Sequence, residues 1–202
     1  MSTVTCHIAM SLDGYVSGRG QSRDAPFGDA GTRLHEWLFE IGEPGRESDA
    51  AVIEEVGQGV GAQIMGRKMF GGGDGSWDET WTGWWGEDPP YHVPVFVLSH
   101  HERAPLPMEG GTTFTFVTDG IESALAQARA AAGDQDVAVA GGASTVNQYL
   151  AAGLVDELYV HLVPLVLGGG ERLLVDVGDL ALEQVKVVPS PTVTHIKYRV
   201  IH

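Results

Sequence analysis

Two glycine-containing turns carry the residues of this sequence that are best suited to hold phosphate groups. Gly141 and Gly142 follow the apolar run 137–140 and lead into a segment with helical spacing, where Ser144 and Thr145 add hydroxyl donors. Residues without a Cβ let a phosphate approach the main chain, and the first N–H groups of a helix supply donors and a partial positive charge. The pattern indicates a seat for a pyrophosphate, although a plain tight turn between a strand and a helix is the alternative interpretation.

A second turn combines a glycine with two cations. Gly66, Arg67 and Lys68 follow another apolar segment, and Ser99 follows the next one along the chain, where it could line the same rim. The chain has 12 Lys and Arg against 27 Asp and Glu, so two adjacent cations in this place favour a phosphate contact. A solvated surface pair is the alternative.

The composition excludes several classes of protein. A formal net charge of −15 repels the phosphates of nucleic acids and the surfaces of anionic membranes, so we expect neither partner. The chain has one cysteine, Cys6, and therefore no disulfide framework, and we expect no metal site. No secretory signal and no stretch of about 18 apolar residues is found. These features predict a cytoplasmic protein whose 202 residues form one domain, 1–202.

The elements that must position the two turns are strands and helices in alternation. Apolar and β-branched runs predict strands at 3–10, 63–66, 94–100, 113–117, 137–140, 157–167, 182–188 and 192–201. Helical spacing is found at 32–41, 49–56, 121–132 and 143–154. Asp119 is placed to cap the helix 121–132. This order predicts an α/β fold with a mostly parallel central sheet, helices on both faces and an antiparallel C-terminal hairpin.

Residues 71–92 have no usable periodicity and hold four of the chain's five tryptophans. Loops of this length in a compact domain are uncommon and often functional. Aromatic side chains in loops also serve to cover the edge of a core. The segment is therefore either such a cover or a wall over a bound substrate.

Four segments, in this order, resemble the dihydrofolate reductase superfamily. They are SLDGYVS after the first strand, IMGRKMF, VFVLSH, and AVAGGASTVNQYLAAGLVDELYVHLVPLVLGGGERL. Within the superfamily the chain resembles the branch that includes the reductase domain of the bifunctional deaminase-reductase of riboflavin biosynthesis. The resemblance covers nearly the whole chain and implies a three-layer αβα sandwich, NADPH as cofactor and a small-molecule substrate. It also implies a homodimer, for which 192–201 could supply an edge strand at the interface.

Carried over by position, the resemblance implies a set of cofactor contacts. Gly66, Arg67 and Lys68 would meet the adenosine 2′-phosphate and the diphosphate, with Ser99 beside the 2′-phosphate. Ala9, at the end of the first strand, would border the nicotinamide. The diphosphate would be held by Gly141, Gly142, Ala143, Ser144 and Thr145.

Two acidic residues are candidates for the catalytic proton donor. Dihydrofolate reductases proper place an acid on the first helix, and Glu36 is the nearest match, but it lies off the apolar stripe of the helix 32–41 and a solvated residue is the alternative. Asp13 in SLDG matches the riboflavin-type branch, where that position lies by the substrate and could bind a substrate hydroxyl or assist proton transfer. An Asp before Gly is also a common turn former. His161 could point inward from its strand, although a histidine satisfied within the sheet is the more common case.

Three functions follow from these patterns. The first is an NADPH-dependent reductase that transfers hydride to a C=N or C=O group of a small heterocyclic or sugar-linked substrate. The second is a nucleotide-binding protein of the same fold without turnover. The third, an ordinary Rossmann dehydrogenase, is disfavoured because the G-x-G-x-x-G pattern is absent and the Gly-Gly turn comes late in the chain.

Overall fold

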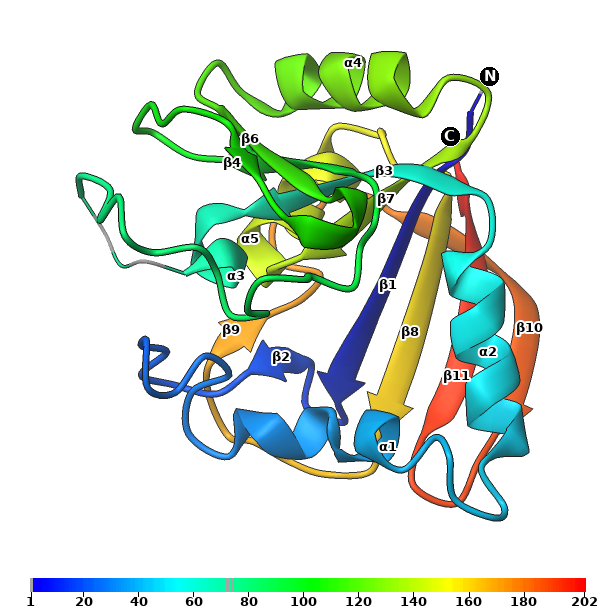
Figure 1. Ribbon diagram of the computed structural model, residues 1–202. Coiled ribbons are helices and arrows are strands. Elements are labelled where there is room, and N and C mark those ends of the chain that lie inside the picture. The colour runs from blue at the N-terminus through cyan, green and yellow to red at the C-terminus, as the bar shows by residue number, and fades with distance from the viewer. Residues whose placement is uncertain (1, 72, 74) are drawn as a thin grey trace.

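A nine-stranded sheet organises the protein, which is described by a computed structural model for residues 2–71, 73 and 75–202 (Figure 1). In sheet order the strands are β10 (Ala181–Pro189), β11 (Thr194–Ile201), β8 (Glu157–Val163), β1 (Val4–Ser11), β7 (Asp136–Gly141), β3 (Val60–Gly66), β4 (Pro94–Leu98), β6 (Thr113–Val117) and β5 (Leu106–Pro107). The pairs from β8 across to β6 are parallel, whereas β10, β11 and β5 run antiparallel to their neighbours. The predicted α/β fold with a mostly parallel sheet and a C-terminal hairpin is confirmed.

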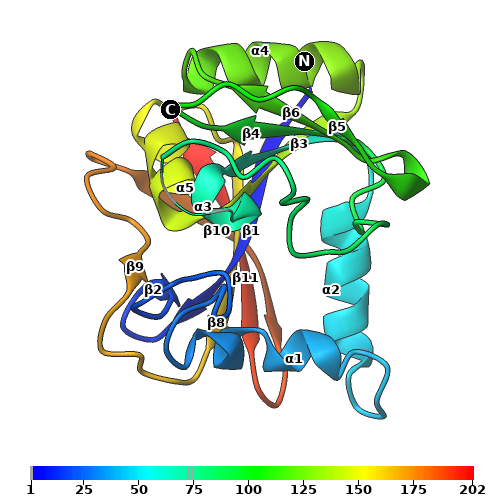
Figure 2. The ribbon, with the colours of Figure 1, turned by 60° about the vertical axis from the view of Figure 1, so that its left-hand side comes forward.

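Helices cover both faces of the sheet (Figures 1 and 2). On one face, α4 (Ile121–Ala132) and α5 (Ala143–Ala151) bury their apolar stripes in the largest core cluster. On the other face lie the 3₁₀ helix η1 (Gly31–Leu34), α1 (Glu36–Phe39) and α2 (Glu47–Gly57). The alternation of β1 separates the two layers, because Val4, Cys6 and Ile8 face the first and Ala9 faces the second. In the part of the chain that the structure describes, no helix combines the length and the apolar character needed to cross a membrane.

The short elements complete the description. The strands β2 (Tyr15–Ser17) and β9 (Glu171–Arg172) pair with each other away from the main sheet. The helix α3 (Arg67–Phe70) follows β3 directly, and the 3₁₀ helix η2 (Glu109–Gly111) precedes β6. The pairing of β2 with β9 brings the segment after β1 next to the glycine-rich segment after β8.

The predicted helix at 32–41 is divided in two. His35 separates η1 from α1, and the amide of Leu38 bonds the carbonyl of His35 at 3.0 Å, an i to i−3 contact. The carbonyl of Leu34, which an α-helix would offer to that amide, instead accepts the indole N–H of Trp37 at 2.9 Å. The indole N–H of Trp37 thus satisfies the carbonyl of Leu34 at the point where the two helices meet.

Two other expectations are wrong in detail. Asp119 does not cap α4, because Gly120 is its N-cap residue, with φ of 100°, and no side chain caps the helix there. The segment 192–201 is not an edge strand, since β11 lies between β8 and β10 and the edge is formed by β10. Only the sheet order, which the sequence does not contain, decides this point. The homodimer itself stays a prediction.

The tryptophans of 71–92 cover an edge of the core; Gly72 and Asp74 of this segment lie outside the described residues. Trp81 donates its indole N–H to the carbonyl of Phe70 at 3.0 Å, and Trp84 donates to that of Met69 at 2.9 Å. The third core cluster, which includes Phe70, is packed by Trp77, Trp81 and Trp85. These contacts fit the role of a cover for the core.

Candidate functional site

The two glycine turns meet at one edge of the sheet. The strands β7, β3 and β4 are adjacent and parallel, so their carboxyl ends lie side by side. In register, Gly141 of β7 is next to Met65 of β3, and Gly66 of β3 is next to Leu98 of β4. The carboxyl edge of a parallel sheet is the place where α/β folds bind ligands. The structure therefore brings together the two phosphate-binding candidates and Ser99.

The Gly-Gly turn presents bare backbone in front of a helix. The Gly141–Gly142 peptide is cis, and Gly141 has φ of 135°, a conformation that favours glycine. Gly142 precedes α5, whose first turn has no side-chain cap among the described residues. A Cβ added to Gly142 would meet nothing within 4 Å, so the space over this peptide is open. An open glycine in front of uncapped amides suits a phosphate oxygen.

Thr145 connects the two turns. The residues next to it that were predicted to hold the diphosphate, Ala143 and Ser144, differ in exposure. A Cβ added to Gly66 would lie 2.3 Å from Oγ1 of Thr145, so the glycine is required by this close approach. Thr145 and Ala143 are buried, and Ser144 is exposed. Within the predicted group, only Ser144 offers its hydroxyl from an exposed position.

Arg67 lies against both Ser99 and the tryptophan-rich segment. Its guanidinium carbon is 3.8 Å from the ring centre of Trp77, its Nε donates to the carbonyl of Gly73 at 2.9 Å, and its Nη1 is 3.5 Å from Oγ of Ser99. The stacked ring fixes the plane of the guanidinium. Arg67 and Ser99, both predicted to meet a 2′-phosphate, are thus neighbours. Lys68 points elsewhere, with its Nζ 2.8 Å from Oε1 of Glu171.

Asp13 has its carboxylate fully engaged in holding a loop. Oδ1 accepts the hydroxyl of Ser11 at 2.6 Å and the amide of Leu167 at 3.1 Å, and Oδ2 accepts the amide of Gly168 at 2.7 Å. The Ser11 hydroxyl and these amides lower the pKa of Asp13 to about 2. Asp13 is therefore ionised at neutral pH and carries no proton to donate. Its contacts attach the segment after β8 to the turn after β1.

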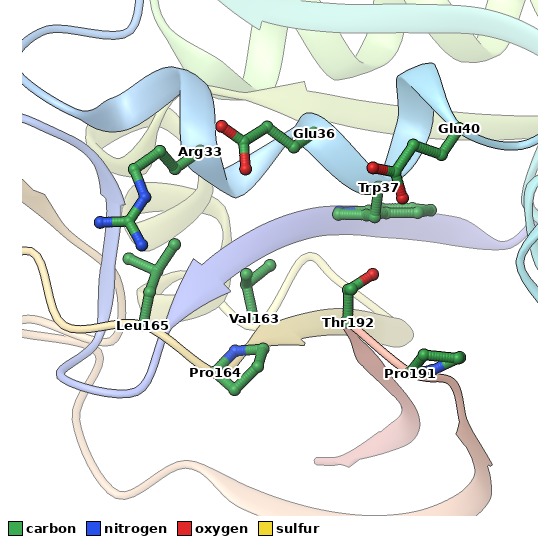
Figure 3. Close-up of a pocket in the computed structure, with 9 residues that line it drawn as sticks. All are labelled: Arg33, Glu36, Trp37, Glu40, Val163, Pro164, Leu165, Pro191 and Thr192. Atoms are coloured by element: carbon green, nitrogen blue, oxygen red, sulfur yellow. The ribbon is translucent and has the colours of Figure 1, made fainter.

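Glu36 lies on the exposed side of α1, at a cavity of about 210 Å³ (Figure 3). The carboxylates of Glu36 and Glu40 line one side of the cavity, with Pro164 and Thr192 on the other. The side chain of α1 that faces the sheet is Trp37, which is 2% exposed and packs in the same cluster as Ala9. Glu36 is thus exposed at the cavity and is not among the buried residues packed with Ala9.

Beside Ala9 lies a chain of polar side chains that the sequence did not reveal. Ala9 is in register with His161 of β8, and His161 contacts His195 of β11, with 2.8 Å between their Nδ1 atoms. Nε2 of His195 is 3.0 Å from Oδ1 of Asp49 on α2. The signal in the sequence was a single histidine in each of these two strands. No local pattern indicates that β8 and β11 lie side by side and bring the two rings together.

The fold and the two glycine turns define a protein of the dihydrofolate reductase-like class. The chain belongs to the family described as the RibD C-terminal domain, whose model matches residues 2–196. This family membership confirms the resemblance to the riboflavin-type reductase branch. No curated protein matches this sequence.

Solved structures agree with this assignment. A protein of Shewanella sp. PV-4, assigned to riboflavin biosynthesis, is 24% identical with a TM-score of 0.65, and the match covers 99% of each chain. Dihydrofolate reductase from Enterococcus faecalis, complexed with NADP(H), is 15% identical with a TM-score of 0.60, covering 99% of this chain and 97% of that one. RibD of Acinetobacter baumannii is 15% identical with a TM-score of 0.60, covering 100% of this chain and 58% of that one. At these identities the likeness shows the fold.

Proposed function

We propose that this protein is an NADPH-dependent reductase. It transfers hydride to a C=N or C=O group of a small heterocyclic or sugar-linked substrate, of pterin-like or pyrimidine-like chemistry. The observation that carries the proposal is the meeting of Gly66, Arg67, Ser99 and the Gly141–Gly142 turn at the carboxyl edge of three adjacent strands. Membership of a reductase-domain family and the likeness to an NADP(H)-complexed dihydrofolate reductase support it.

The residues at this edge suit the parts of NADPH. Arg67 and Ser99 provide a cation and a hydroxyl for the 2′-phosphate, and the open backbone of Gly142 with the first amides of α5 suits the diphosphate. Ala9 is a small, buried residue on the next strand, β1, where a flat nicotinamide ring could approach the sheet. When bound, the cofactor supplies the hydride; the protein orients it and excludes water.

A nucleotide-binding protein without turnover is the second candidate. The observation that favours it concerns the two acids expected to donate a proton, because Asp13 is ionised and fully hydrogen-bonded and Glu36 lies on the exposed side of α1. Reduction of a C=N or C=O group needs a proton as well as hydride. Another donor is therefore required for the first candidate.

A titration with NADPH and NADH, followed by fluorescence, tests the cofactor site. We expect NADPH to bind more tightly than NADH, and Arg67→Ala to weaken NADPH binding at least tenfold, about 1.4 kcal/mol, with a smaller effect on NADH. Arg129→Ala on the exposed side of α4 serves as the matched control and should bind like the wild type. Equal binding of the two nucleotides, or an unaffected Arg67→Ala variant, would contradict the proposed 2′-phosphate contact.

Turnover separates the two candidates. NADPH oxidation is followed by absorbance with dihydrofolate and with 5-amino-6-(5-phosphoribosylamino)uracil as acceptors. Oxidation that depends on either acceptor supports the reductase. Tight NADPH binding without oxidation by these acceptors or by a wider set of C=N and C=O compounds would favour the second candidate.

A further inference from the structure

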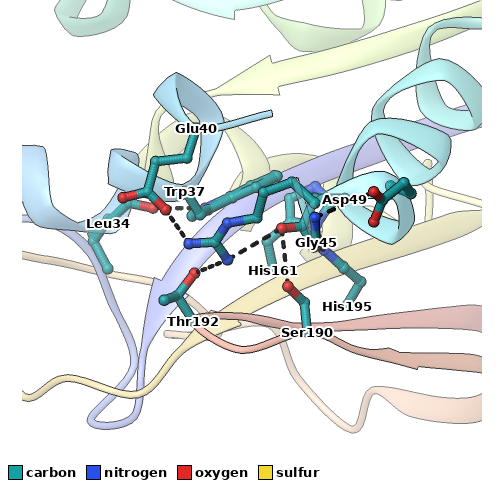
Figure 4. Close-up of polar contacts among 11 residues, drawn as sticks. Leu34, Trp37, Glu40, Gly45, Asp49, His161, Ser190, Thr192 and His195 are labelled. Atoms are coloured by element: carbon teal, nitrogen blue, oxygen red, sulfur yellow. Dashed lines mark hydrogen bonds and ion pairs between the residues drawn. The ribbon is translucent and has the colours of Figure 1, made fainter. Parts of the chain in front are cut away.

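A continuous line of polar contacts crosses the layer between the sheet and α2, and Figure 4 shows its part from Asp49 to His161. Oδ1 of Asp49 is 3.0 Å from Nε2 of His195, and Nδ1 of His195 is 2.8 Å from Nδ1 of His161. Nε2 of His161 is in turn 3.5 Å from Nδ1 of His7 on β1. His195 and His161 each use one nitrogen toward one neighbour and the other nitrogen toward the next. The line thus joins a carboxylate on α2 to β1, an interior strand of the sheet.

Only one end of this line approaches the surface. Asp49 and His195 are 0% exposed and His161 is 2% exposed, whereas His7 is half-buried. Burial lowers the pKa of His7 and, together with the nearby histidines, lowers the pKa of His161 well below its ordinary value. Both rings are therefore neutral at pH 7. A neutral imidazole has one donor and one acceptor nitrogen, which is what passage of a proton along the line requires.

The outer end of the line lies beside the position proposed for the nicotinamide. His7 and Ala9 are two residues apart on β1, so they share a face of the sheet and lie about 7 Å apart. His161 is the register partner of Ala9. A substrate that stacks against a nicotinamide at Ala9 would meet His7 next.

We propose that His7, His161 and His195, held by Asp49, form a proton relay that protonates the substrate during its reduction. His7 is the catalytic residue, because it would touch the substrate heteroatom. The other three groups act through His7 and are positioning residues. His195 and His161 pass the proton on to His7, and Asp49 holds His195. This inference rests on the proposed reductase function and identifies its proton donor.

The protons along the relay balance as follows. In the charged form His195 carries protons on both nitrogens and is paired with the carboxylate of Asp49, while His161 and His7 each carry a proton on Nε2. As hydride from NADPH forms a new C–H bond, Nε2–H of His7 protonates the substrate heteroatom. His161 passes its Nε2 proton to Nδ1 of His7, and His195 passes its Nδ1 proton to Nδ1 of His161. His195 is left neutral, with Nε2–H donated to Asp49. After the product leaves, His7 takes up a proton from solvent.

The surroundings of Asp49 and His195 favour the role of the Asp49 carboxylate as the partner of His195. Oδ2 of Asp49 accepts the hydroxyl of Ser190 at 2.9 Å, and Nη1 of Arg46 is 3.5 Å from the same oxygen. These contacts keep the carboxylate in place and available to His195. Among the described residues, the groups that face these rings are His35 and Trp37 from the η1–α1 segment and Tyr159 from β8. Glu55 on α2 acts on Tyr159 and not on the rings directly, and Lys197 on β11 is paired with Glu157 and Glu55.

Nitrogen NMR of ¹⁵N-histidine-labelled protein tests the relay without a substrate. Because each ring donates to or accepts from the next, we expect His161 and His7 to move their protons from Nδ1 to Nε2 together when the line takes up a proton. In Asp49→Asn a neutral amide replaces the carboxylate that contacts His195, so the joint change should differ from that of the wild type. Tautomers of His161 and His7 that change separately, or that ignore Asp49→Asn, would overturn the relay.

Turnover provides the second test, with the two acceptors named above. His7→Gln and Asp49→Asn should bind NADPH within about twofold of the wild type but lose at least a hundredfold in turnover at pH 7, the lower range for general acid catalysis. His202→Gln, an exposed histidine at the C-terminal end, is the matched control and should retain full turnover.

The outcomes separate the relay from the function on which it rests. A wild type that binds no NADPH overturns both. A wild type that turns over, with His7→Gln equally active, overturns the relay alone and leaves the reductase. If Asp49→Asn does not fold, the turnover of His7→Gln, a variant at the half-buried end of the line, decides whether the relay exists. If neither acceptor is reduced, the joint tautomer change in the spectra decides.

Discussion

Lys68 on α3 and Glu171 on β9 form an ion pair across 103 positions of sequence, with 2.8 Å between Nζ and Oε1. Lys68 is 62% exposed, so the pair contributes little to the stability of the fold, about 0 to 1 kcal/mol. Its significance concerns the cofactor, because the family resemblance implies a phosphate contact for Lys68, whereas in the structure its ammonium group is paired with Glu171. A carboxylate of the protein and a phosphate of NADPH would then compete for Lys68.

Glu171→Gln should therefore strengthen NADPH binding. Removal of the competing charge is expected to lower the Kd roughly two- to fivefold, which corresponds to about 0.5 to 1 kcal/mol. The measurement is a fluorescence titration at low ionic strength. Glu183→Gln, which breaks the exposed pair with Arg199 in the C-terminal hairpin, is the control and should leave the Kd unchanged. Unchanged or weaker binding by Glu171→Gln would show that Lys68 does not contact the cofactor.

The two glycines of the Gly141–Gly142 turn should respond differently to alanine. Gly142 has φ of −75° and open space where a Cβ would project, so Gly142→Ala should melt like the wild type. Its methyl group would occupy the proposed diphosphate position and weaken NADPH binding about tenfold or more, equivalent to 1.4 kcal/mol. Gly141→Ala instead forces alanine to φ of 135° and should lower the free energy of unfolding by about 1 to 3 kcal/mol. Tight NADPH binding by a folded Gly142→Ala protein would place the diphosphate elsewhere.

Asp13 should stabilise the protein in a defined range of pH. Its pKa is lowered from 3.8 to about 2, so the folded state holds the ionised form more strongly than the unfolded chain does. The resulting stabilisation is complete above about pH 4 and disappears as the pH falls through about 2. Thermal melting of wild type and Asp13→Asn should thus differ at pH 6 and converge near pH 2.

Asp134→Asn is the control for this series, because Asp134 is exposed. Asp78, whose pKa is also lowered to about 2, is present in all three proteins and cancels from the comparison. A difference between wild type and Asp13→Asn that persists at pH 2 would mean that the hydrogen bonds of Asp13 do not depend on its charge.

Trp84 should stabilise the cover over the core edge through its indole N–H. Trp84→Phe removes the donor that satisfies the carbonyl of Met69 and should lower the free energy of unfolding by about 1 kcal/mol beyond the loss of ring area. Trp85→Phe is the matched control, since the indole N–H of Trp85 has no hydrogen bond to the described residues while its ring stacks on Phe114. Urea denaturation measures both. Equal losses would mean that packing alone anchors the segment.

The sequence predicts local features of this protein better than distant ones. The Gly-Gly turn and the turn at Gly66 are each determined by a few consecutive residues. Both lie at the ends of strands, as expected. One continuous helix was predicted at 32–41, where the structure has two short ones. The apolar spacing does not indicate the hydrogen bond from the Trp37 indole to the carbonyl of Leu34. The line from Asp49 to His7 joins four elements, so its existence depends on sheet order and register, which no local pattern encodes.

The position of β1 inside the sheet, between β8 and β7, has a consequence for the order of folding. Its two parallel neighbours, β7 and β8, begin at Asp136 and Glu157, so the first strand of the chain gains its hydrogen-bonding partners only when most of the polypeptide is available. Pairings this distant in sequence make folding slow. During synthesis, the strand that carries His7 and Ala9 leaves the ribosome long before its two neighbouring strands are available, so the proposed site around it is completed among the last parts of the molecule.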